Sequence, residues 1–87
     1  MSNNLLVDFS IKDLENLSGI KAHTIRIWEK RYNLLEPRRS ETNIRTYGAD
    51  SLKKLLNISF LSGKGLKISK LAKLSEHEVA QLVVKYM

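Results

Sequence analysis

Cations and an isoleucine share one side of a short segment of this chain. Residues 24–32 read TIRIWEKRY, in which basic residues alternate with apolar and aromatic ones. Because successive residues of a helix rotate by about 100°, Ile27 and Lys30 fall on one side, with Arg26 and Arg31 on its flanks. A major groove accepts such groups: cations for phosphates, arginine for guanine, and an apolar group for the thymine methyl. The segment therefore indicates contact with duplex DNA, with a merely solvated helix face as the alternative.

The opposite side of the same segment carries residues at core spacing. Ile25 and Tyr32 are seven positions apart, with Trp28 between them, so these three form a single stripe. A tryptophan among cations could instead stack on single-stranded bases. Its place beside Ile25 favours packing, so we expect the stripe to face the core. His23 falls on the outer side with Ile27, where it is a candidate for DNA contact.

A second basic element follows the helix. Arg38 and Arg39 precede the polar turn Ser40–Asn43, and Ile44 to Tyr47 follow it, a pattern that predicts a β-hairpin. We expect Arg38 and Arg45 to lie near each other across this hairpin, with Arg39 beside them, where they could follow a DNA backbone. The alternative is that arginines only protect an edge strand from aggregation.

A first helix is expected just before the basic one. Ser10 is a typical N-cap residue, Ile11, Leu14 and Leu17 recur on one face, and Gly19 breaks the pattern. The second helix is expected over residues 21–32. Two short helices joined by a tight turn that contains glycine are typical of a helix-turn-helix.

Further helices are expected after the hairpin. The third covers residues 49–62, with Leu52, Leu55, Leu56 and Ser59 on its inner side, and ends at Gly63 and Gly65 in a left-handed turn. A short fourth helix is marked by Ile68, Leu71 and Ala72. A capping box of Ser75 and Glu78 begins the fifth, whose inward residues are Val79, Leu82, Val83 and Tyr86. Lys67, Lys70 and Lys73 form a basic row that could touch phosphates or only be solvated.

Composition limits the classes of function that are expected of this chain. The net charge is +6, and residues 21–47 hold seven cations against three anions, a balance that attracts polyanions. The absence of cysteine and the presence of only two histidines argue against a metal site or a cysteine nucleophile. No catalytic constellation or phosphate-binding glycine loop is visible, so we do not expect this protein to be an enzyme. No signal peptide or apolar run of about 18 residues occurs, so we expect a cytoplasmic chain that does not contact membranes.

These motifs resemble the N-terminal DNA-binding domain of MerR-type transcriptional regulators. The resemblance rests on Thr24-Ile25-Arg26 followed by an aromatic residue and an acid, on Leu34-Leu35-x-Pro37, and on Arg45-x-Tyr47, and it extends from about Phe9 to Leu74. The stretch RIWEKRYNLLEPRR is similar to the branch in which this domain precedes a cobalamin-binding sensor.

The resemblance implies a mainly α fold: a winged helix-turn-helix with a two-stranded β-hairpin wing and additional C-terminal helices. A flexible N-terminus (residues 1–8) is expected before a domain at 9–87. Within that domain the helix-turn-helix covers 9–32, the wing 36–47 and the supporting helices 49–87. The second helix would enter the major groove and the wing would contact the backbone. Thr24, Arg26 and Arg45 would touch DNA, while Ile25 and Tyr47 would be buried.

The resemblance also bears on ligands and partners. It implies double-stranded DNA as the partner, with RNA polymerase or an acidic antirepressor protein as candidate protein partners. No cofactor is expected in this chain; a cobalamin-type effector and the dimerisation regions would lie in a C-terminal part of a longer regulator. Two residues depart from the family pattern: Lys21 stands where a serine often caps the second helix, and Asn33 where glycine is frequent.

The sequence is compatible with two other functions. The basic surface could dock an acidic protein, which a footprint on duplex DNA would distinguish. Alternatively, the chain could be an excisionase-like architectural factor, which shares the fold and would differ in how strongly it bends DNA.

Overall fold

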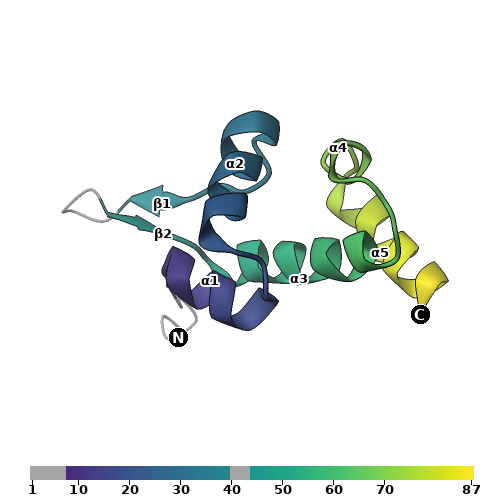
Figure 1. Ribbon diagram of the computed structural model, residues 1–87, viewed down its shortest axis with the longest axis horizontal. Helices are drawn as coiled ribbons and strands as arrows, with labels where there is room; N and C mark the ends of the chain where they lie inside the picture. The colour runs from purple at the N-terminus through teal and green to yellow at the C-terminus, as the bar shows by residue number, and fades with distance from the viewer. Residues whose placement is uncertain (1–7, 40–43) are drawn as a thin grey trace.

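The computed structural model describes residues 8–39 and 44–87. Within these residues it has five helices and a two-stranded antiparallel hairpin, which confirms the winged helix-turn-helix architecture (Figure 1). The elements in chain order are α1 (Ile11–Ser18), α2 (Ala22–Tyr32), β1 (Arg38–Arg39), β2 (Arg45–Thr46), α3 (Ala49–Gly63), α4 (Ile68–Leu71) and α5 (Glu76–Tyr86).

Local signals set the bounds of α1. Ser10 Oγ accepts a hydrogen bond from the Asp13 N–H at 3.0 Å, and Asp13 Oδ2 accepts one from the Ser10 N–H at 3.0 Å. This reciprocal pair satisfies two N–H groups at the start of the helix that have no intrahelical partner. Gly19 ends α1 with φ 81°, a backbone conformation that glycine adopts without a steric cost.

The start of α2 is satisfied by a residue from the preceding helix. Lys21 is the N-cap and makes no side-chain capping bond, as its departure from serine suggested. Instead, the Ala22 N–H donates to Glu15 Oε1 of α1 at 3.2 Å. At its other end α2 stops at Asn33, which adopts the left-handed conformation (φ 53°) that asparagine tolerates.

The hairpin forms a wing that projects from the helices (Figure 1). Arg38 pairs with Thr46, and Arg39 with Arg45. Phe9 extends this pairing, because its N–H and C=O exchange two 2.8 Å hydrogen bonds with Tyr47. The predicted turn, residues 40–43, lies outside the described residues, as does most of the N-terminal segment expected to be flexible.

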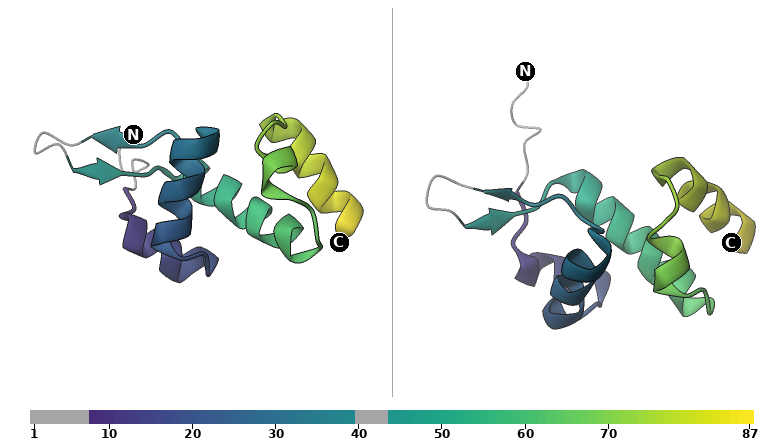
Figure 2. Two further views of the ribbon diagram at one scale, coloured as in Figure 1. Left: turned by 45° about the horizontal axis from the view of Figure 1, so that its top comes forward. Right: turned by 90° about the horizontal axis from the view of Figure 1, so that it is seen from above.

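α3 runs through the middle of the molecule and joins its two ends. α1, α2 and the wing lie toward its N-terminal end, and α4 and α5 toward its C-terminal end (Figures 1 and 2). Ser59 Oγ of α3 donates to the Ser18 C=O at the end of α1, at 3.3 Å. Gly63 is still helical, and the left-handed turn after α3 occurs at Gly65, with φ 96°.

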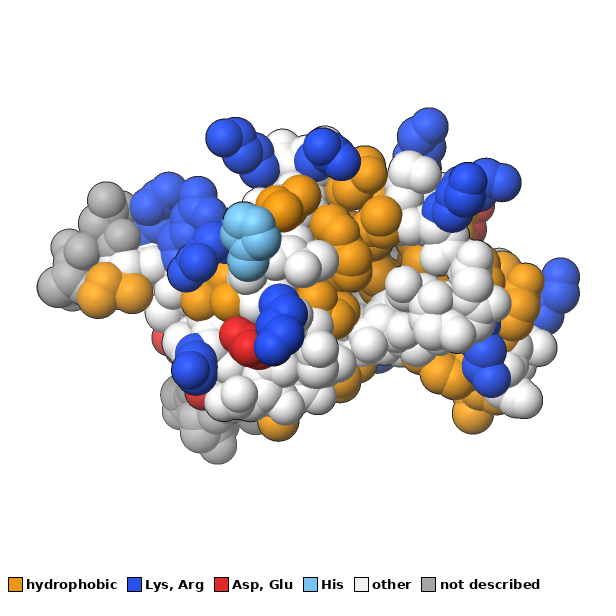
Figure 3. Space-filling model, viewed as in Figure 1, with side chains coloured by type: hydrophobic (Ala, Val, Ile, Leu, Met, Phe, Trp, Pro, Cys, Tyr) orange, Lys and Arg blue, Asp and Glu red, His pale blue; other side chains and the backbone are white. Residues whose placement is uncertain are grey.

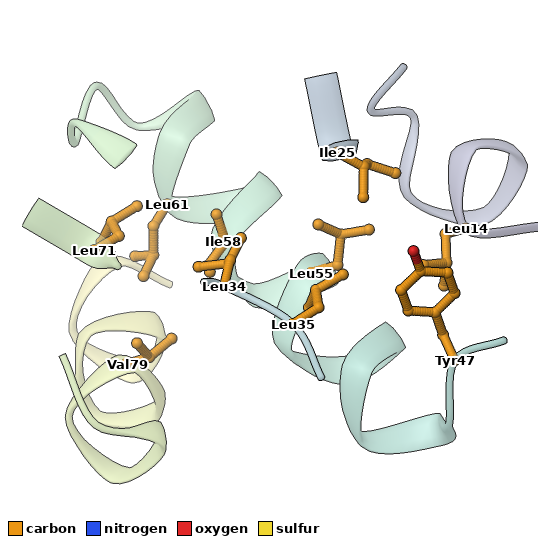
Figure 4. Packing of buried hydrophobic residues seen from close by; sticks show 10 residues of the cluster. All are labelled: Leu14, Ile25, Leu34, Leu35, Tyr47, Leu55, Ile58, Leu61, Leu71 and Val79. Atoms are coloured by element: carbon orange, nitrogen blue, oxygen red, sulfur yellow. The ribbon is translucent and has the colours of Figure 1, made fainter. Parts of the chain in front are cut away.

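A continuous apolar core spans the molecule (Figure 4). Its buried residues are Leu14, Ile25, Leu34, Leu35, Tyr47, Leu55, Ile58, Leu61, Leu71 and Val79. Three residues expected inside are exposed instead: Leu17, Leu56 and Tyr86. The buried side of α3 carries Ser51, Leu55, Ile58 and Leu61, and Leu56, one position past Leu55, is turned away from it. Leu17 and Tyr86 each lie in the last two residues of their helix.

Candidate nucleic-acid interface

The outer face of α2 carries the expected basic set. His23, Arg26, Lys30 and Arg31 are exposed, and Thr24 is half-buried. Ile27 is 39% exposed on the same helix on which Ile25 is fully buried. The predicted helical phase is therefore confirmed: one isoleucine packs in the core and the other faces away from it.

The inner face of α2 carries the three residues of the predicted stripe, but only Ile25 is fully buried. Trp28 is partly buried against the core cluster, which supports a packing role for its ring. Tyr32 is also only partly buried. Trp28 therefore supports α2 at the edge of the core, whereas Tyr32 is not among the residues that pack against the core cluster.

The three wing arginines divide between the two faces of the hairpin. Arg39 and Arg45 are cross-strand partners, so their side chains share one face, whereas Arg38 shares the other face with Thr46. Arg45 therefore lies directly opposite Arg39, whereas the sequence led us to expect Arg38 near it across the hairpin. Arg38 Nη1 forms an ion pair with Asp8 Oδ1 at 2.9 Å, and its guanidinium covers Gly48, where a Cβ would overlap it.

A buried carboxylate joins α2 to the wing. Glu29 Oε1 accepts a hydrogen bond from Tyr47 Oη at 2.5 Å, and Arg45 Nη1 lies 3.6 Å from Glu29 Oε2. The side chain of Glu29 is 8% exposed and that of Arg45 48% exposed. Glu29 was not among the site residues predicted from the sequence. Its signal was an acid four positions after Ile25, on the side of the helix that turns toward the core.

This contact changes the acidity of the tyrosine. Burial, the hydrogen bond to Glu29 and the charge of that carboxylate disfavour the phenolate, and Arg45 opposes them only in part. The pKa of Tyr47 rises to about 12 as a result. Tyr47 is therefore a neutral hydrogen-bond donor at physiological pH.

A groove opens between α2 and the wing, with a volume of about 460 Å³. We call it the helix–wing groove, and its lining residues are Arg26, Glu29, Lys30, Asn33, Leu35, Pro37 and Arg45. It brings together three of the predicted DNA-contact residues, from both basic elements. The remaining candidates, His23, Thr24, Ile27, Arg31, Arg38 and Arg39, do not line it.

Basic side chains extend beyond the groove along one edge of the molecule. Lys and Arg side chains gather along the upper edge of the face in Figure 3, over the wing, α2 and α4. The row of Lys67, Lys70 and Lys73 is exposed. This edge could follow a polyanion over the length of the molecule.

Residues 8–39 and 44–87 contain no group of three His, Cys, Asp or Glu side chains that could hold a metal ion. In the same residues, no helix is long and apolar enough to cross a membrane.

Comparison with known proteins decides the family. Residues 9–78 match the family described as MerR HTH family regulatory protein. This chain belongs to the MerR family. The family is one of transcriptional regulators, and DNA binding and a winged helix-turn-helix fold are its attributes.

Two relatives of this MerR-family domain show how far the similarity extends. It is 35% identical over 66 residues to the HTH-type transcriptional repressor CarH of Myxococcus xanthus. The aligned segment covers 76% of this chain and 22% of that protein. The crystal structure of a MerR-family transcriptional regulator from Bacillus cereus shares the fold, with a TM-score of 0.69 at 21% identity, over 92% of this chain and 63% of that one. The chain thus spans about a fifth of the curated relative and less than two thirds of the solved one.

Proposed function

We propose that this domain binds double-stranded DNA in a sequence-specific manner, with α2 in the major groove and the wing on the adjacent backbone. The observation that carries the proposal is the helix–wing groove, where Arg26 and Lys30 of α2 and Arg45 of the wing face a common space. Arginine and lysine are the side chains that most often contact guanine edges, and both also bind phosphates.

The two elements have different roles in this proposal. α2 reads bases through Arg26 and Ile27, which lie on its exposed face. The wing fixes the register on the backbone through Arg45, because phosphate contacts position a protein but carry no sequence information directly. We propose effector binding, dimerisation and contacts with protein partners only for further regions of a longer regulator. We do not assign these functions to residues 8–87.

The test is selection of preferred duplexes from a random pool, followed by footprinting and titration of variants. Arg26→Ala should lose about 10- to 100-fold affinity for the preferred site and little for random duplex, since a bidentate base contact contributes about 1–3 kcal/mol of discrimination. Arg45→Ala should weaken binding to both duplexes by similar factors.

Lys85→Ala serves as the matched control, because it removes one exposed cation from α5, away from the wing and α2. It should bind both duplexes nearly as the unmodified domain does. Absence of any footprint, together with tight binding to an acidic protein, would favour the protein-docking alternative. Strong bending of the bound duplex in a circular-permutation gel assay would favour the architectural alternative.

A further inference from the structure

We infer that Glu29 is a positioning residue for DNA binding, whose buried carboxylate fixes the wing against α2 and holds Arg45 at the helix–wing groove. The inference deepens the proposed function and rests on it. It concerns a residue that touches no DNA in that proposal, because its side chain is almost wholly covered by protein.

The geometry of the contact shows how one side chain can act on the whole wing. The two carboxylate oxygens of Glu29 engage different wing residues, Oε1 with Tyr47 Oη and Oε2 with Arg45 Nη1. Tyr47 directly follows β2, and Arg45 begins it. Two attachments at either end of β2 restrain both its distance from α2 and its rotation, which a single contact would not do.

The chemistry of Arg45 leaves it able to bind a phosphate at the same time. A guanidinium carries five N–H donors, and the contact with Glu29 engages only one of its amino groups. About half of the side chain remains exposed. Arg45 also interacts with the Tyr47 hydroxyl and lines the helix–wing groove. Glu29 and Tyr47 therefore orient Arg45 from the protein side, while its exposed half remains open to the groove.

Long-range electrostatics make the inference testable, because a charge effect and a positioning effect of Glu29 would change DNA affinity in opposite directions. Glu29 is an acid among the cations of the groove, so its charge by itself repels a polyanion. Neutralising it would tighten DNA binding if charge were its only effect. A loss of affinity on neutralisation therefore reports positioning.

The experiment compares Glu29→Gln with Glu36→Gln in titrations with a selected duplex. Glu36 is an exposed acid that does not line the helix–wing groove, so its variant is the matched loss of one negative charge. Glu29→Gln should weaken binding about tenfold, the scale of a lost charge-assisted hydrogen bond. Glu36→Gln should bind as tightly as the unmodified domain or slightly more tightly. Equal or tighter binding by Glu29→Gln would overturn the inference.

A double-mutant cycle tests whether Glu29 acts through Arg45. In an Arg45→Ala background, Glu29→Gln should weaken binding much less than in the unmodified domain, because the side chain that it orients is absent and only the attachment through Tyr47 remains. A full loss of affinity in that background would show that Glu29 does not act through Arg45. If Glu29→Gln does not fold, Tyr47→Phe removes only the phenol donor and keeps the ring. It should weaken binding in the same direction, and unchanged affinity would count against the inference.

A measurement without DNA separates this inference from the proposed function. In the free domain, NMR titration of the Tyr47 phenol should show its raised pKa falling toward 10.0 in Glu29→Gln. If the unmodified domain binds no duplex while this fall is seen, the proposed function fails and the link between Glu29 and the wing stands. If the pKa of Tyr47 is the same in both proteins, the link itself is wrong.

Discussion

Two isoleucines of α2 that are two positions apart lie in opposite environments. Ile25 is fully buried, whereas Ile27 is 39% exposed among cations. A two-residue step rotates a helix by about 200°, so the burial of one all but fixes the exposure of the other. The same rotation places Glu29 toward the core, where it meets the wing.

The two isoleucines therefore predict opposite mutational effects. Ile25→Ala should cost about 2–5 kcal/mol of unfolding free energy because it opens a cavity in the core. Ile27→Ala should change stability by less than about 0.5 kcal/mol, as at an ordinary surface position. For binding, Ile27→Ala should lose discrimination at one thymine-containing base pair, since the thymine methyl is an apolar feature of the major groove.

Denaturant melts and titrations against sites changed one base pair at a time would measure both effects. Equal destabilisation by the two variants would show that the helical phase is wrong. If Ile27→Ala is stable and binds every site as before, Ile27 is solvated surface, and base readout rests on Arg26 and Lys30.

Tyr47 makes the stability of the domain depend on alkaline pH. Its pKa is raised from 10.0 to about 12 in the folded chain, so the neutral phenol is favoured by folding. The unfolded chain therefore binds fewer protons between these values, and the contribution of Tyr47 is complete below pH 10 and lost as the pH rises toward about 12.

Comparison with Tyr47→Phe isolates this contribution, because lysines and the other tyrosines titrate in both proteins. The unmodified domain should lose more stability than Tyr47→Phe when urea melts below pH 10 are compared with melts near pH 12. Parallel losses in the two proteins would show that folding does not raise the pKa of Tyr47.

At the scale of elements, α1 and α2 are joined by a cap as well as by apolar packing. The Ala22 N–H at the start of α2 donates to Glu15 of α1 across a separation of seven residues. A carboxylate at this position satisfies a free N–H group and interacts favourably with the helix dipole. α1 thereby sets where α2 begins, although Lys21 provides no side-chain cap.

Removing this cap should destabilise the domain. We expect Glu15→Ala to cost about 1 kcal/mol, the usual effect of losing a helix cap. Asn16→Ala, at the exposed neighbouring position of α1, is the control and should change stability by less than about 0.5 kcal/mol. Thermal or urea unfolding followed by circular dichroism measures both, and equal effects of the two variants would mean that Glu15 caps nothing in solution.

At the scale of the whole molecule, α3 holds the wing and α2 toward one end and α4 toward the other (Figure 1). Their cations lie along a common edge (Figure 3). Other Lys and Arg side chains lie elsewhere on the same face, but the row along this edge gives the molecule an electropositive side that attracts polyanions.

This arrangement predicts a steep dependence of binding on salt. If five to seven cations contact phosphates, log K should fall with log salt at a slope of about −5 to −6. Replacing Lys67, Lys70 and Lys73 together by glutamine should make the slope shallower by about 2 to 3 if α4 also contacts the backbone. An unchanged slope would make these lysines solvated surface, and a slope near zero for the unmodified domain would exclude DNA as its main ligand.

Much of the fold followed from the sequence because its determinants are local. Ser10 with Asp13 and Ser75 with Glu78 begin helices through bonds that span three residues. Gly19 and Asn33 end helices through their own backbone conformations. The side of α2 that is buried followed from a periodicity within one helix. Such signals do not depend on how the elements are packed, so the helices, the hairpin and the family resemblance were readable from the chain alone.

What only the tertiary structure decided involves residues that are distant in sequence or at the limits of an element. The contact between Glu29 and Tyr47 spans 18 residues and the pair of Asp8 and Arg38 spans 30, so both require the wing and the helices to be placed first. The partner of Arg45 across the hairpin depended on strand register, which composition does not fix. Periodicity shows which side of a helix is apolar, but not how much of that side the neighbouring elements cover. For that reason Leu17, Leu56 and Tyr86 are exposed although their spacing placed them inside.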